Sequence, residues 1–128
     1  MKSLNPHGLK ARPYYNHVKI RPGMPVFPTG QVAWDESGNI VGAGDIRRQV
    51  EQVYHNLDLL LQGLNATRDC IVKTTTYVTN RDYAAAIHHG REAFFSGLEL
   101  PASTLIEVTG LAEPELMLEI EIVVMLSE

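Results

Sequence analysis

The chain has 128 residues, of which 45% are hydrophobic and 20% are charged, and its formal net charge at pH 7 is −4. This length and composition fit one globular domain, and the negative charge argues against nucleic acid as a partner. No apolar run approaches the roughly 20 residues of a membrane helix, and the N-terminus lacks the apolar core of a signal peptide. We therefore expect a cytoplasmic protein with no membrane partner.

The first third of the chain is predicted to be extended. Residues 1–13 contain two prolines and a glycine and follow no hydrophobic period, which predicts an irregular N-terminal arm. Residues 17–21 and 24–34 favour extended structure, and the turn Pro22-Gly23 between them predicts a hairpin. Because Pro25 and Pro28 remove backbone donors, the second strand of this hairpin is expected at an edge or a bulge.

Two helices follow, each leading into a strand. Apolar residues spaced three and four apart predict a helix from residue 46 to about 64, with Asp45 as its cap and Gly63 near its end. Residues 70–79 are rich in threonine and valine and predict a strand. The second helix is capped by Asn80 or Asp82 and ends near Gly97.

The last part of the chain predicts two more strands, at residues 103–108 and 116–126. In the final strand LMLEIEIVVML, alternation puts only apolar residues on one face, whereas the other face carries Glu119, Glu121, Val123 and Met125. The order ββ-α-β-α-ββ predicts one α+β domain. Two helices cover only one face of such a sheet, so the second face is expected to be the interface of a homo-oligomer.

Several residues that could carry chemistry also have a structural explanation. Cys70, the single cysteine, excludes an intrachain disulfide and reads as a small buried residue. Glu119 and Glu121 are two apart on one strand and suit acid and base roles; the alternative is that one is exposed and the other satisfies a neighbour. His88 points toward a cleft beside the second helix or serves a structural role, and Ser103 is a turn hydroxyl. No metal or nucleotide motif is present, so no cofactor is expected.

Several segments in series resemble the RidA (YjgF) family over nearly the whole chain. They are TGQVAWDESGNIVG, IRRQVEQVYHNLDLLLQGL, DCIVKTTTYVTNRDYAAA, EAFF, PAST and LEIEIVVM. The resemblance implies a chorismate-mutase-like fold, with a mixed sheet and two helices packed on one face, and a single RidA-like domain over residues 1–128. It also implies a homotrimer with small-molecule clefts between subunits and metal-free hydrolysis of enamines or imines to keto acids and ammonia.

The resemblance also assigns the cleft position by position. It implies Glu119 as the acid that positions water, Tyr14 as the cleft tyrosine with Tyr15 as the alternative, and Gly30 as the glycine whose backbone meets the ligand. Ser103 stands where the family's best-known branch has an arginine that clamps a carboxylate, and His88 stands at a common asparagine.

These two departures place the chain in an arginine-lacking branch and leave its function open. If the protein is an enzyme, we expect Glu119 and His88 as catalytic residues, with His88 replacing the lost charge or donating a proton, and Tyr14, Gly30 and Ser103 as substrate-binding residues. The alternative is a metabolite-binding, regulatory trimer without catalysis. A ribonuclease or translation inhibitor, a function attached to some relatives, is the reading least supported by the acidic composition.

Overall fold

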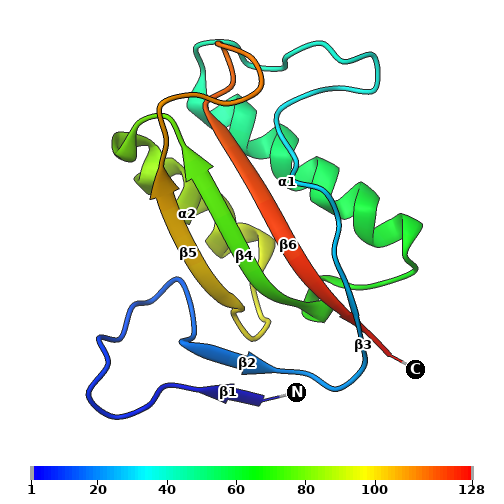
Figure 1. Cartoon of the computed structure of the whole chain (residues 1–128), viewed down its shortest axis with the longest axis vertical. Coiled ribbons are helices and arrows are strands. Elements are labelled where there is room, and N and C mark those ends of the chain that lie inside the picture. Colours follow the sequence, from blue (N-terminus) through cyan, green and yellow to red (C-terminus); the bar gives the residue numbers. More distant parts are fainter. Residues whose placement is uncertain (1, 128) are drawn as a thin grey trace.

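The structure, a computed structural model, describes residues 2–127 and consists of a sheet with two helices on one of its faces (Figure 1). None of the helices in this part of the chain has the length and apolarity to cross a membrane. The elements are β1 (Lys2–Leu4), β2 (Val18–Ile20), β3 (Met24–Val26), α1 (Ile46–Gly63), β4 (Ile71–Val78), α2 (Ala84–Phe94), β5 (Ala102–Glu107) and β6 (Leu118–Leu126), with short 3-10 turns at Arg68–Cys70 and Arg81–Tyr83.

The main sheet has the strand order β3-β6-β4-β5. Strand β6 runs antiparallel to both β3 and β4, whereas β4 and β5 are parallel and are connected through α2. This mixed sheet with two covering helices confirms the predicted α+β, chorismate-mutase-like fold. Strand β3 lies at an edge, where the missing donor of Pro25 is tolerated.

The predicted hairpin is wrong, because its two strands lie in different sheets. Strand β2 pairs with β1, and β3 pairs with β6. The chain turns away at Gly23, which has a φ of 142° and lies so close to β6 that a Cβ there would come within 2.1 Å of the Leu126 carbonyl oxygen. Lys19 is buried and its ammonium donates to the carbonyls of Asp69, Ile71 and Glu99, which holds β2 at the base of β4.

The N-terminal arm also differs from the expectation at its start. Residues 2–4 form β1 and pair with β2 in a separate two-stranded sheet, whereas an irregular arm was expected over residues 1–13. Three residues are too few to show a hydrophobic period, so the pairing partner rather than the local sequence determines this strand. Met1 lies outside the described residues.

Helix α1 has the predicted start and inner face. The Asp45 carboxylate accepts from the backbone amide of Arg48, as an N-cap residue should. The helix ends at Gly63, and the left-handed residue that follows it is Asn65, with a φ of 53°. The inner face packs on the sheet through Val50, Val53, Leu57 and Leu61, which are all buried.

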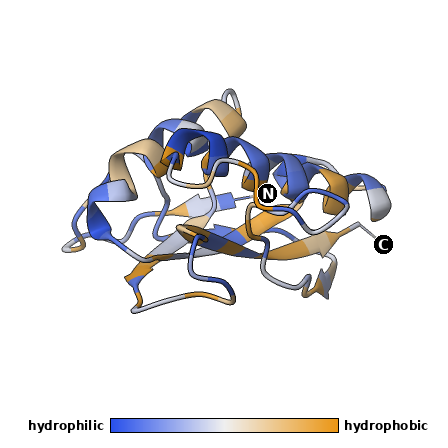
Figure 2. Ribbon diagram, turned by 90° about the horizontal axis from the view of Figure 1, so that it is seen from above, coloured by the Kyte–Doolittle hydropathy of each residue, from blue (hydrophilic) through white to orange (hydrophobic). Residues whose placement is uncertain are grey.

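Helix α2 packs directly against α1. A Cβ at Gly90 would lie 2.5 Å from Val50 Cγ1, so the two helices approach more closely than any side chain at this position allows. The predicted cap of α2 is wrong, because Asn80 caps the 3-10 turn Arg81–Tyr83 by accepting from the backbone amide of Asp82, and α2 follows this turn without a side-chain cap of its own. The resulting helix layer lies entirely on one side of the sheet (Figure 2).

The side chains of β6 alternate between the two faces of the main sheet, one covered by the helices and one open. On the covered face Leu118, Ile120, Ile122 and Val124 are all buried beneath the helices. The open face carries the alternate residues Glu119, Glu121, Val123 and Met125.

Candidate functional site

Tyr14 and His88 form one part of the candidate site. Their rings are stacked, with centroids 3.8 Å apart and planes 13° from parallel. Tyr15 instead meets Tyr14 edge-on and lies against His17. Both stacked rings line a cavity of about 380 Å³ between the N-terminal arm and the end of α2. Tyr14 is thus the tyrosine that meets His88, the choice that the sequence left open.

His88 is arranged as a neutral hydrogen-bonding group. Its Nδ1 atom is buried and has no hydrogen-bond partner among the described residues. Burial, and secondly the charge of Arg91, lower the pKa of His88 below its ordinary value of 6.5. A ring with a lowered pKa is mainly uncharged at pH 7, which favours hydrogen bonding by His88 over the positive charge expected at this position.

Arg91 lies beneath this part of the site and was missed in the sequence. It is 3% exposed and donates to the carbonyl oxygens of Tyr14 and Pro101 and to Oγ1 of Thr74. These acceptors come from the segment between the N-terminal arm and β2, from the turn before β5 and from β4, so a single guanidinium joins three segments. The signal was its spacing, because a residue four positions after the inward-facing Ile87 also points inward.

Ser103 lies next to the Arg91 network. On β5 it stands opposite Thr74 of β4, the residue whose hydroxyl accepts from Arg91. Neighbouring residues in a ladder point to the same face, so the half-buried Ser103 faces the helix side of the sheet.

Gly30 and Glu119 form the other part of the candidate site. A Cβ at Gly30 would lie 2.1 Å from Glu119 Oε2, so the carboxylate occupies the space that a side chain would fill. The contact is fixed by Gln31, which exchanges backbone hydrogen bonds of 2.8 and 3.0 Å with Ile120. The glycine and the acid are therefore held together by the edge of the sheet.

The open face around Glu119 carries further polar groups. Tyr77 lies opposite Glu119 in the ladder and donates from its hydroxyl to Glu121 Oε1 at 2.7 Å. This hydrogen bond is the main reason why the pKa of Tyr77 is raised. The neighbouring Glu121 is thus engaged by a phenol, whereas Glu119 is held against the Gly30 backbone.

In a single chain the five predicted site residues fall into two groups. Tyr14, His88 and Ser103 gather around Arg91 on the helix side of the sheet. Gly30 and Glu119 meet at the open face. The contacts of one chain therefore build two half-sites on opposite faces of the sheet.

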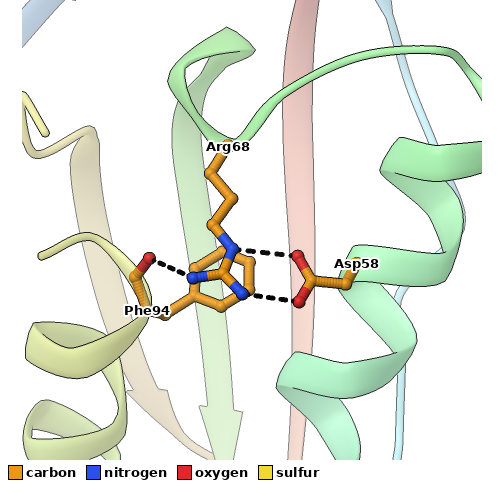
Figure 3. Close-up of polar contacts among 3 residues, drawn as sticks. All are labelled: Asp58, Arg68 and Phe94. Atoms are coloured by element: carbon orange, nitrogen blue, oxygen red, sulfur yellow. Dashed lines mark hydrogen bonds and ion pairs between the residues drawn. The ribbon is translucent and has the colours of Figure 1, made fainter.

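A second cavity of about 380 Å³ lies between the two helices and is lined in part by Arg68. The Arg68 guanidinium binds both carboxylate oxygens of Asp58, at 3.0 and 2.7 Å, donates to the Phe94 carbonyl and lies over the Phe94 ring (Figure 3). The hydrogen bond with Asp58 raises the pKa of Arg68. The charge is neutralised locally, so this arrangement connects the 3-10 turn Arg68–Cys70 to both helices. Within residues 2–127 no group of three His, Cys, Asp or Glu side chains is placed to hold a metal ion.

The architecture places the chain among proteins of the chorismate-mutase-like fold, in which helices cover one face of a mixed sheet and the other face is open. Residues 6–126 match the family model described as Endoribonuclease L-PSP, and the chain belongs to this family, the RidA (YjgF) proteins. A protein of unknown function of the conserved Rid family, YyfB from Yersinia pestis, is 35% identical, with 98% of each chain covered and a TM-score of 0.90.

Two further relatives agree with this assignment. A RutC family protein of Synechocystis sp. is 30% identical over 88% of this chain and 85% of its own length. A protein from Lactococcus lactis, named as a candidate regulator, AldR, is 30% identical over 85% of this chain and 84% of its own length.

Proposed function

We propose that the chain forms a homotrimer whose subunit seams hold small-molecule clefts, and that these clefts hydrolyse small enamines or imines to keto compounds and ammonia. The observation that carries the proposal is the division of the site residues into two half-sites on opposite faces of one sheet. A cleft with all five residues needs the open face of one subunit beside the arm and α2 of another. The apolar Val123 and Met125 on the open face support such an assembly.

The proposed reaction needs an imine, water and a positioned base. Glu119 orients a water molecule and accepts its proton while the oxygen bonds to the imine carbon. Glu119 returns this proton to the imine nitrogen, which gives a neutral carbinolamine. The carboxylate then transfers the carbinolamine hydroxyl proton to the amino group as the carbon–nitrogen bond breaks, so that ammonia and the keto compound leave and Glu119 is ionised again. Glu119 suits this task because the Gly30 contact fixes its carboxylate, whereas Glu121 is occupied by Tyr77.

The other residues bind rather than react in this proposal. His88 is neutral and offers a ring nitrogen without a partner, so it hydrogen-bonds the ligand while Tyr14 stacks on it. Ser103 adds a hydroxyl where relatives of the best-known branch carry an arginine. Endoribonuclease, the activity in the family's description, is not the function we propose, because an acidic chain offers no general attraction for RNA phosphates.

The test is ammonia and keto-acid release from freshly generated 2-aminoacrylate and a panel of bulkier imines. We expect turnover above the spontaneous rate, and a loss of about 100-fold or more in Glu119→Gln, the range that a positioned base contributes. Glu121→Gln is the matched control on the same strand and face, and it should keep most of the activity. Equal turnover in wild type and Glu119→Gln would contradict the mechanism.

Metabolite binding without catalysis is the second candidate, and the regulator name of the Lactococcus lactis relative favours it. Ser103→Arg separates the two functions. A gain of imine hydrolysis in this variant would indicate a site that is otherwise intact. If neither the wild type nor the variant turns over any imine, while calorimetry detects a bound keto acid, the protein is a binding module.

A further inference from the structure

Arg91 is a buried cation without a buried anion. Within residues 2–127 the ion pairs are Arg68–Asp58 and Arg81–Glu107, so no described carboxylate lies within ion-pair distance of Arg91. Its hydrogen-bond acceptors are two carbonyls and a hydroxyl, which are all neutral. Tyr54 also faces Arg91, but burial raises the pKa of that phenol to about 12, so it remains uncharged at pH 7.

Arg68 offers a direct comparison in the same chain. Each guanidinium lies over a phenylalanine ring, at 4.1 Å from the ring centroid for Arg68 and 5.2 Å for Arg91, but only that of Arg68 is neutralised by a bidentate carboxylate. Burying a charge without such a counter-ion is costly, and one compensation is an anion that binds nearby. Arg91 is therefore a buried charge that no carboxylate in the described part of the chain neutralises.

The charge lies directly behind the wall of the Tyr14–His88 cavity. Arg91 contacts the backbone of Tyr14 and is one helical turn from His88, and both of these residues line the cavity. Glu92 also lines it, but this carboxylate is exposed to solvent, where water screens its charge. The Arg91 field acts through protein, where screening is weaker.

We propose that Arg91 is a specificity-determining residue that makes the Tyr14–His88 cavity prefer small carboxylate ligands over their neutral analogues. The proposal rests on the function proposed above and names its ligand class. The Arg91 guanidinium lies beneath the cavity wall and attracts a carboxylate through its electrostatic field and through its hydrogen bonds to Thr74 and the Tyr14 backbone. The nearby Ser103 is neutral and cannot provide this attraction. The lowered pKa values of His88 and Lys73, to which the Arg91 charge contributes after burial, are consistent with a field that reaches both faces.

The probes are pyruvate, a keto-acid product of the proposed reaction, and its neutral isostere pyruvamide. Calorimetry on the wild-type protein should show at least tenfold tighter binding of pyruvate. Arg91→Gln should bring the two affinities within about twofold, mainly by weakening pyruvate binding, whereas Arg91→Lys keeps the charge and should keep most of the preference. Arg68→Gln removes a neutralised guanidinium from the other helix groove and should leave the preference unchanged.

A second readout needs no ligand and so separates this inference from the proposed function. NMR titration of the His88 ring should give a higher pKa in Arg91→Gln than in wild type, because a positive neighbour has been removed, and this rise would support the inference even if neither probe binds. An unchanged His88 pKa would overturn it. Equal binding of pyruvate and pyruvamide by the wild type would also overturn it, whether or not Arg91→Gln folds.

Discussion

Gly30 leaves room for the Glu119 carboxylate. A side chain at residue 30 should therefore impair activity without lowering the stability of the fold. A methyl group at residue 30 would collide with Oε2 and crowd the Cδ atom at 3.0 Å. Because the carboxylate is the free end of a flexible side chain, it can swing away at little cost in stability. It then no longer points where the Gly30 backbone directs it.

We therefore expect Gly30→Ala to lower imine turnover by about 100-fold, as displacements of a catalytic group by about 1 Å can do. The midpoint of chemical unfolding should change little. Gly110→Ala is the control, because a Cβ there meets nothing within 4 Å. Full turnover in Gly30→Ala would show that the Glu119 position is not set by this contact.

At the residue scale, strand and helix patterns pointed to Glu119, His88 and Ser103, the family resemblance added Tyr14 and Gly30, and the structure adds how these residues meet. The Tyr14–His88 stack and the Gly30–Glu119 contact join residues that are 74 and 89 positions apart in the chain, so local patterns do not reveal them. Arg91 was overlooked because an arginine is ordinarily solvent-exposed, whereas its place on the inner helical stripe requires burial.

At the element scale, the contact between α1 and α2 depends on a single residue, Gly90. Gly90 packs against Val50 and Tyr54, and a Cβ there would lie 2.5 Å from the valine and 3.1 Å from the tyrosine ring. Both neighbours are buried, so neither can move without disturbing the core.

We expect Gly90→Ala to lower the free energy of unfolding by about 1–3 kcal/mol, the usual cost of overpacking, even though alanine favours helices. Gly63→Ala, also in a helix but with nothing within 4 Å of its Cβ, should be neutral or stabilise by up to about 1 kcal/mol. Urea denaturation of the two variants measures both values. Stabilisation by Gly90→Ala would mean that the helices can separate freely.

Helices and strands with strong local sequence patterns were predicted well. Strand pairings between segments far apart in the sequence were not. The Asp45 cap and the apolar period located α1, and alternation located β6. The hairpin prediction was wrong because a turn at Pro22-Gly23 can also connect two strands that pair with other partners. What separates them is Lys19, whose acceptors come from residues 69, 71 and 99 and could not be identified from the local sequence.

At the scale of the whole molecule, the open face of the main sheet has no covering layer among residues 2–127. Half-buried Val123 and Met125 lie there, next to two carboxylates on the same strand. Because the proposed cleft needs a second subunit on this face, assembly and activity should be lost together.

Light scattering on the wild-type protein should give three times the 14.2 kDa chain mass. Val123→Glu should produce monomers, because it adds a charge beside Glu121 in a surface that must be desolvated. Leu59→Glu places the same charge on the outer face of α1, where the leucine is 50% exposed, and should leave the trimer intact. A monomeric wild type would contradict the assembly.

The attachment of the N-terminal arm has a consequence for how this protein can change over evolution. Arg91 binds the carbonyl of residue 14 rather than its side chain, Asn16 donates from its backbone to Pro101 and from its amide to the Leu100 carbonyl, and Lys19 also binds only carbonyls. The position of the cavity wall is thus independent of which side chain residue 14 presents. Selection can exchange that side chain to suit a new ligand without rebuilding the scaffold that carries it.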